Sequence, residues 1–292
     1  MLPMPNEIES FTDYLKTRRY SPHTVANYEL DLRLFFALIE KPPAQITWRD
    51  VDCFLQQQHR QGLAPTTVNR RIHALKSFYE FLFVTGSDEY PMPIKPSHYV
   101  RQGRPLPKKL TTVEVKRLFA QIINEVDKTL FLLMLRCGLR VAEVAALRLP
   151  DIDWTERTLI VRQGKGRKDR RVYLSNDILS SLEQLLNLRP RAIPEDIVFW
   201  NQKRIWQPLS IKAIQKKMER YAKSANIKAS CHSLRHTFAS NLLEAGAEVV
   251  YIKEFLGHNS IASSERYARL SNQRVKQMYL QTIGKVINKT RV

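Results

Sequence analysis

The chain has 292 residues, of which 43% are hydrophobic and 26% are charged, which is a globular composition with room for two domains. Its formal net charge is +19 and its pI is near 10.0, which indicates a polyanionic partner. No apolar run approaches the roughly 18 residues of a membrane span, and the residues from Met1 to Glu7 do not look like a secretory signal.

The distribution of charge is uneven. Residues 1–100 hold 11 Lys and Arg and 11 Asp and Glu, so the whole positive excess lies beyond residue 100. A nucleic acid is a suitable partner for this excess of positive charge, although charge alone leaves affinity for ribosomes or membrane surfaces open. The cysteines Cys53, Cys137 and Cys231 show no CxxC spacing, so we expect free thiols, a cytoplasmic location and no metal site.

Residues 1–87 read as a helical domain. Helix starts are predicted at Ser21 and Thr47, and a third helix opens at Pro65 with an apolar stripe along one side. The other side of that helix carries polar residues at spacings of three and four, which suit phosphates and base edges as well as a solvated face. The DNA-binding candidates on it are Asn69, Arg70, His73 and Lys76.

Residues 88–109 are rich in proline and in basic side chains. Proline stiffens and extends a segment, so we expect a linker between two domains. Arg101 and Arg104 in this linker are predicted to lie against a DNA backbone.

Residues 110–292 read as a second, mainly helical domain with one hairpin. Two β-prone runs, 158–162 and 171–174, flank the basic loop 164–169. The loop lacks the glycine spacing and the Ser or Thr of a P-loop, so nucleotide binding is not expected. The predicted fold class is mainly α with a small β-hairpin.

Several short strings in this second domain carry residues suited to phosphate chemistry. Arg140 follows Gly138 at a predicted turn, and His232 and Arg235 share one face of a predicted helix. An arginine can clamp two phosphate oxygens, but each of these residues alone fits a surface ion pair or a cap equally well. The strings are Cys137–Glu143, Gly164–Lys168, His232–His236, Leu256–His258 and Arg266–Tyr267.

Together these strings resemble the tyrosine recombinase (phage integrase) family, most of all its compact Xer branch. The resemblance implies an N-terminal core-binding (SAM-like) domain over 1–87 and a catalytic domain over 110–292. It implies six catalytic residues, with Tyr267 as nucleophile and Lys165 as general acid beside Arg140, His232, Arg235 and His258. It also implies that Glu143 orients Arg140, and that Arg167 and Lys168 grip the DNA backbone.

The same resemblance implies a site-specific recombinase that works through a 3′-phosphotyrosine intermediate without metal, ATP or other cofactor. The expected partners are double-stranded DNA with paired half-sites, further protomers of a homo- or hetero-tetramer, and accessory proteins. A predicted helix over 275–287 would dock on a neighbouring protomer, or else pack on its own chain. A type IB-like topoisomerase and a non-catalytic DNA-binding protein are the alternatives, and chromosome-dimer resolution and mobile-element integration are both open.

Overall fold

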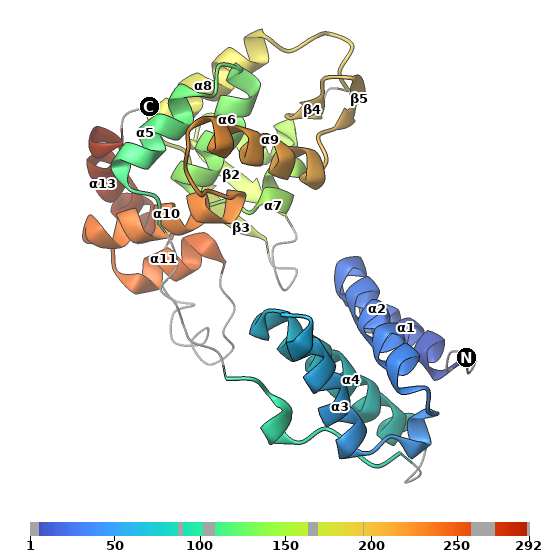
Figure 1. Ribbon diagram of the computed structural model, residues 1–292. Helices are drawn as coiled ribbons and strands as arrows, with labels where there is room; N and C mark the ends of the chain where they lie inside the picture. Colours follow the sequence, from blue (N-terminus) through green and yellow to red (C-terminus); the bar gives the residue numbers. More distant parts are fainter. Residues whose placement is uncertain are drawn as a thin grey trace. The chain divides into compact units, whose positions relative to one another are not determined.

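The computed structural model describes residues 6–86, 90–101, 109–162, 169–194, 196–257 and 272–290. The chain divides into two compact units, Met1–Pro105 and Leu106–Val292. Over the described ranges both units are mainly helical, and small antiparallel sheets lie in the second, which confirms the predicted fold class (Figure 1). No helix in these ranges is long and apolar enough to cross a membrane.

The first unit is built on helices whose starts are capped by local side chains. Ser21 Oγ accepts a 3.0 Å hydrogen bond from the Thr24 amide, and Asp50 accepts one of 2.8 Å from the Thr47 amide. Both predicted helix starts are therefore confirmed. The helices are α1 (Glu7–Thr17), α2 (Pro22–Ile39), α3 (Trp48–Arg60) and α4 (Pro65–Gly86), with short 3₁₀ turns η1 (Pro43–Gln45) and η2 (Pro96–His98).

Aromatic side chains fill the core of this unit. Phe35 packs edge-on against Phe54 at 5.1 Å between ring centroids, and Phe11 packs in the same way against Phe78 at 5.6 Å. All four rings are buried, and each contributes about 1.5–3 kcal/mol relative to an exposed side chain. The periodic apolar stripes of the sequence thus meet in a single cluster.

Residues 90–101, which belong to the predicted linker, pack against the first unit. Ile94 and His98 are buried there. The Asn69 amide holds the end of the segment, because its Nδ2 donates to the Val100 carbonyl at 2.9 Å and its Oδ1 accepts from the Val100 amide at 2.8 Å. Val100 lies in no helix or strand, so the Asn69 side chain satisfies its backbone donor and acceptor. The domain boundaries themselves stay predictions.

The second unit surrounds helix α6 (Glu125–Cys137), whose residues 129–137 are all buried. A helix that is apolar on every side belongs in the centre of a core, and α6 packs against both α8 and α10. The remaining helices are α5 (Thr112–Ala120), α7 (Val141–Ala145), α8 (Asn176–Asn187), α9 (Ile211–Ser224), α10 (Cys231–Glu244), α11 (Val249–Leu256) and α13 (Asn272–Lys289), with the 3₁₀ turn η3 (Leu149–Asp151).

The predicted hairpin is present as two antiparallel strands. Leu159 pairs with Val172 and Val161 pairs with Arg170, so the basic loop joins the two strands. A third strand extends this sheet in the order β1-β2-β3, and β4 pairs with β5 elsewhere. The strands are β1 (Ile152–Asp153), β2 (Thr158–Val161), β3 (Arg170–Tyr173), β4 (Trp200–Asn201) and β5 (Arg204–Pro208).

Helix α13 packs within its own chain. Tyr279 and Ile283 are buried in a cluster that includes Phe255 of α11, and Figure 1 shows α13 beside α10. The fully buried Arg136 of α6 holds the end of α13 through hydrogen bonds to the Thr290 hydroxyl at 2.6 Å and the Thr290 carbonyl at 2.9 Å. The predicted helix is confirmed, and its docking on another protomer stays a prediction.

Candidate active site

Arg140 sits at the turn between α6 and α7. Gly138 ends α6 with a positive φ of 63°, and Arg140 is the residue that precedes the first turn of α7. Its amide donates to Glu143 Oε2 and its Nη1 donates to Glu143 Oε1, both at 2.7 Å. The predicted role of Glu143 as a partner of Arg140 therefore has a direct geometric basis.

Helix α10 brings His232 and Arg235 to the same place. Ser230 opens this helix by accepting a 3.2 Å hydrogen bond from the Ser233 amide. The Arg235 side chain is 4% exposed and donates to the carbonyls of Gly138 and Leu256. Arg235 thereby fixes the end of α6 and the end of α11 against each other.

Arg170 is a further residue of this site, and no motif of the sequence pointed to it. Its Nη1 and Nη2 donate to the two oxygens of Glu143 at 2.7 and 2.8 Å, and its Nε donates to the Phe255 carbonyl at 2.9 Å. The basic run from Arg167 to Arg171 contains it, but nothing in that run distinguishes one arginine from the next.

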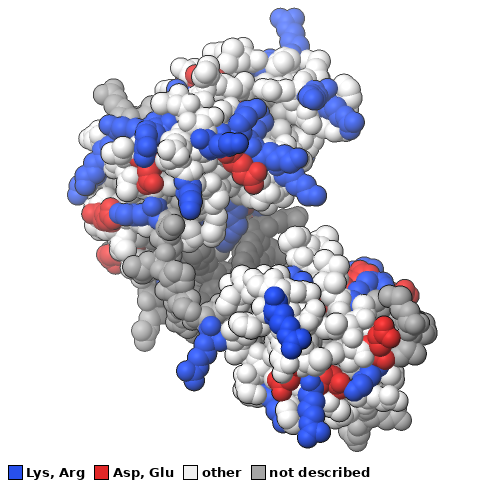
Figure 2. Space-filling view, viewed as in Figure 1, with Lys and Arg blue, Asp and Glu red and all other residues white. Residues whose placement is uncertain are grey.

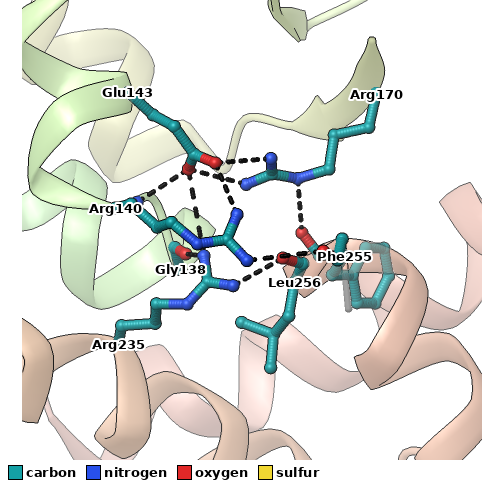
Figure 3. A network of polar contacts seen from close by, with 8 residues as sticks. Gly138, Arg140, Glu143, Arg170, Arg235, Phe255 and Leu256 are labelled. Carbon is teal, nitrogen blue, oxygen red and sulfur yellow. Dashed lines mark hydrogen bonds and ion pairs between the residues drawn. The ribbon is translucent and has the colours of Figure 1, made fainter. Parts of the chain in front are cut away.

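The end of α11 completes the arrangement. Gly257 terminates the helix with a φ of 58°, and its carbonyl accepts from Arg140 Nη2 at 3.3 Å. A Cβ on Gly257 would lie 3.1 Å from Cδ of Arg170, so glycine suits both the backbone conformation and the close packing. Figure 3 shows the three arginines converging on the Glu143 carboxylate from α7, β3 and α10.

The charges of this group do not cancel. Three guanidinium groups surround one carboxylate, which leaves a net charge of two positive units among these four side chains. Burial raises the pKa of the Glu143 carboxyl, but hydrogen bonds and charge from Arg170, together with hydrogen bonds from Arg140, bring it down to about 2. Burial, followed by the charge of Arg140, lowers the pKa of Arg235 to about 10, so Arg235 stays charged at neutral pH.

His232 differs from the arginines in its charge state. Burial is the largest cause that lowers the pKa of its imidazole, followed by the nearby charges of His236, Arg235 and Arg140. The rings of His232 and His236 lie edge to face with 4.2 Å between their centroids. His232 is therefore mainly neutral at pH 7 and can accept or donate a proton.

A cavity of about 500 Å³ opens beside these residues. Its lining includes Arg140, Val141 of α7, Met218 of α9, and His232 and Arg235 of α10. The exposed edge of the arginine group thus faces a space that a phosphate with its flanking sugars could enter. In the described ranges, no group of three or more His, Cys, Asp and Glu side chains is placed to hold a metal ion.

The structure brings part of the predicted site together. Arg140, Glu143, His232 and Arg235 meet at this cavity or beside it. Six further predicted residues lie outside the described residues, namely Lys165, His258, Tyr267, Arg104, Arg167 and Lys168.

The predicted DNA-binding residues of α4 each have a partner within the first unit. Besides the contact of Asn69 with Val100, Arg70 pairs with the buried Asp31, and Lys76 Nζ lies 3.6 Å from Glu80. His73 Nδ1 lies 3.4 Å from the Tyr99 hydroxyl. Arg101 is exposed at the end of the described segment. Contact of these residues with DNA stays a prediction.

The two units differ in surface charge. On the face drawn in Figure 2, lysine and arginine side chains spread over the second unit with few acidic ones between them, whereas both signs mix on the first unit. This agrees with the sequence, where the positive excess lies beyond residue 100.

Comparison with known proteins places both units. The phage integrase family matches residues 108–274, and the phage integrase N-terminal SAM-like domain matches residues 8–86. Tyrosine recombinase XerA of Pyrococcus horikoshii is 32% identical over 270 residues, which is 92% of this chain and 91% of the relative. Tyrosine recombinase XerC of Oceanobacillus iheyensis is 30% identical over 94% of this chain and 95% of its own length. A crystal structure of XerA recombinase aligns with a TM-score of 0.50 and 27% identity, covering 94% of this chain and 97% of that one.

The two family matches cover both units of the chain, and they define an enzyme that breaks and rejoins DNA. The chain therefore belongs to the phage integrase family of tyrosine recombinases, which are site-specific enzymes that cut and rejoin DNA.

Proposed function

We propose that this enzyme cleaves DNA by attack of the Tyr267 hydroxyl on a backbone phosphate held by Arg140 and Arg235. The attack forms a 3′-phosphotyrosyl bond and expels the 5′ oxygen of the next nucleotide, which Lys165 protonates. Return of a 5′-hydroxyl from another strand breaks the phosphotyrosyl bond and completes strand exchange. The bond energy is kept in the covalent intermediate, so no ATP is consumed.

The arrangement of the arginines carries this proposal. A phosphodiester bears one negative charge, and a transition state attacked by a phenolate approaches two, which equals the excess of two positive charges among Arg140, Arg170, Arg235 and Glu143. Because these cations are fixed before DNA arrives, they need little reorganisation during the reaction. Each such donor contributes about 10²–10³ in rate in other enzymes.

Arg140 and Arg235 retain donors for the phosphate. Within the described part of the chain, the Arg140 guanidinium donates to Glu143 and Gly257, and that of Arg235 donates to Gly138 and Leu256. Each guanidinium has five N–H groups, so the rest can point into the cavity that both residues line. We assign His232 to proton transfer at the tyrosine or to a further phosphate contact, and His258 to a phosphate contact.

The substrate we propose is double-stranded DNA with paired half-sites, bound by a tetramer of recombinase protomers in the cytoplasm, with accessory proteins as further partners. The net charge supports DNA as the partner. A solved structure of XerH site-specific recombinase bound to difH substrate shares the fold, with a TM-score of 0.67 and 22% identity over 92% of this chain and 82% of that one.

A nicked duplex tests the proposal. Target DNA would be recovered by the full-length protein from a random-sequence pool and nicked just 3′ of the mapped cleavage position, so that the short product diffuses away and traps the intermediate. We expect a covalent protein–DNA adduct in the presence of a chelator, and none with Tyr267→Phe, which should bind the same DNA equally well. An adduct that forms equally with Tyr267→Phe would overturn the assignment.

A further inference from the structure

Arg170 links three segments of the second unit. It opens strand β3, it binds both oxygens of Glu143 on α7, and it binds the Phe255 carbonyl on α11 (Figure 3). Arg140 begins α7, and the chain leaves α11 at Gly257. One side chain therefore fixes the spacing between the hairpin, the start of α7 and the end of α11.

The contacts of Arg170 are of the strong, directional kind. Its side chain is 11% exposed and that of Glu143 is 7% exposed, so water competes little for the two parallel hydrogen bonds. All three guanidinium nitrogens are engaged, which leaves Arg170 turned toward protein rather than toward the cavity. Lysine offers one nitrogen and cannot reproduce this paired geometry.

We infer that Arg170 is a positioning residue for DNA cleavage, which holds Glu143 in the orientation that places the Arg140 guanidinium at the scissile phosphate. The inference rests on the proposed function, because Arg140 acts on phosphate only there. Glu143 Oε1 accepts from both Arg170 Nη1 and Arg140 Nη1 at 2.7 Å. A carboxylate held by Arg170 therefore also holds the Arg140 guanidinium in place. Nothing in the sequence motifs assigned a role to Arg170.

The electrostatics of the group give a second consequence. Burial raises the pKa of Glu143, and Arg170 is the first of the groups that lower it, ahead of Arg140. Without Arg170 the Glu143 pKa must therefore rise, and the carboxyl becomes protonated at a higher pH than in the native enzyme. The other charged groups that contact Glu143 in the described residues are Arg140 and Arg235, and the titratable His232 interacts with both of these arginines.

The test uses full-length protein and the nicked duplex above, with Arg170→Ala, Arg170→Lys and the control Arg171→Ala. Arg171 is the next residue of the same strand and is exposed, so its removal takes away one positive charge without touching Glu143. We expect single-turnover cleavage to fall about 10²-fold for Arg170→Ala and about 10-fold for Arg170→Lys, as in other cases of misplaced catalytic groups. The control should stay within about threefold, and DNA affinity should change little in all three.

Two readouts separate positioning from general support of the fold. Cleavage by Arg170→Lys relative to wild type should decline further as the pH is lowered from about 7 to about 5, because Glu143 then loses its charge. Adding Arg170→Ala to Glu143→Ala should cost almost nothing more, because Arg170 acts through that carboxylate.

The possible results have distinct meanings. Additive losses in the double variant, a pH-independent ratio, or wild-type cleavage by Arg170→Ala would each overturn the inference while leaving the proposed function intact. Absence of any adduct with the wild-type protein would instead refute the proposed function. If Arg170→Ala does not fold, Arg170→Lys still gives the loss in cleavage rate and the pH dependence of its rate relative to wild type.

Discussion

Glu143 organises the cationic site. Its carboxylate holds three arginines together in a buried space. Without it, no negative charge in this group would offset their mutual repulsion. The separation of Arg140 and Glu143 by three residues made this pair predictable from sequence. Arg170 lies 27 residues further on, and only the tertiary structure shows that it reaches the same carboxylate.

The replacement Glu143→Gln should destabilise the second unit, and the effect should depend on pH. The folded pKa of about 2 lies below the ordinary value of 4.5, so the carboxylate contributes stability that is full above about pH 4.5 and is lost as the pH falls through about 2. The difference between these two pKa values corresponds to about 3 kcal/mol.

Hydrogen exchange of α6 amides measures this free energy in the full chain. The free energy of unfolding of Glu143→Gln should be about 3 kcal/mol lower than that of wild type at pH 7, and this gap should shrink as the pH approaches 3. Glu183→Gln, an exposed change on α8, serves as the control and should show no gap. A gap that stays constant with pH would mean that lost charge pairing is not the cause.

At the scale of elements, the end of α6 positions the arginines. Gly138 turns the chain with a positive φ, its carbonyl accepts from Arg235, and Arg140 follows two residues later. The predicted glycine turn is confirmed. The sequence could not show that Phe238 of α10 packs directly on Gly138, because this contact depends on how two helices 100 residues apart cross.

The replacement Gly138→Ala should therefore impair both stability and cleavage. A Cβ there would lie 2.5 Å from Cδ1 of Phe238, and alanine also disfavours the positive φ, for a combined cost of about 2–4 kcal/mol. Gly62→Ala is the matched control, since Gly62 has a φ of +68° with open space around its Cβ position, and it should cost about 1 kcal/mol. Urea unfolding measures the free energy of unfolding of both variants. Equal losses of stability in the two would exclude the argument that the Phe238 contact makes Gly138 special.

At the scale of the whole molecule, charge sets the affinity for DNA. The positive excess beyond residue 100 predicts strongly salt-dependent binding, with a logarithmic slope of about −0.9 for each phosphate contacted. Replacing both Arg101 and Arg104 by alanine should reduce the slope by up to about two if they lie on the backbone as predicted.

The control for this titration is the pair Lys16→Ala and Arg18→Ala. It removes two charges from exposed positions on or next to α1 and should leave the slope nearly unchanged. Binding isotherms over a range of salt concentrations give both slopes, and an unaltered slope in the Arg101 and Arg104 variant would remove those residues from the interface.

Most of the fold followed from local patterns, whereas parts of the site depended on distant contacts. Helical periodicity and capping residues predicted the helices, and the paired β-prone runs predicted the hairpin. The hold of Asn69 on residues 90–101 was not predictable, because its polar side chain reads as a surface residue. Its two hydrogen bonds to Val100 arise only once the chain has turned back on α4.

The most direct measurement is the identity of the amino acid joined to DNA. After trapping on the nicked duplex, protease and nuclease digestion followed by mass spectrometry should yield a peptide spanning residues 266–269 with a nucleotide phosphate on Tyr267. A nucleotide on any other residue, or no covalent linkage while the DNA is still cut, would contradict the account.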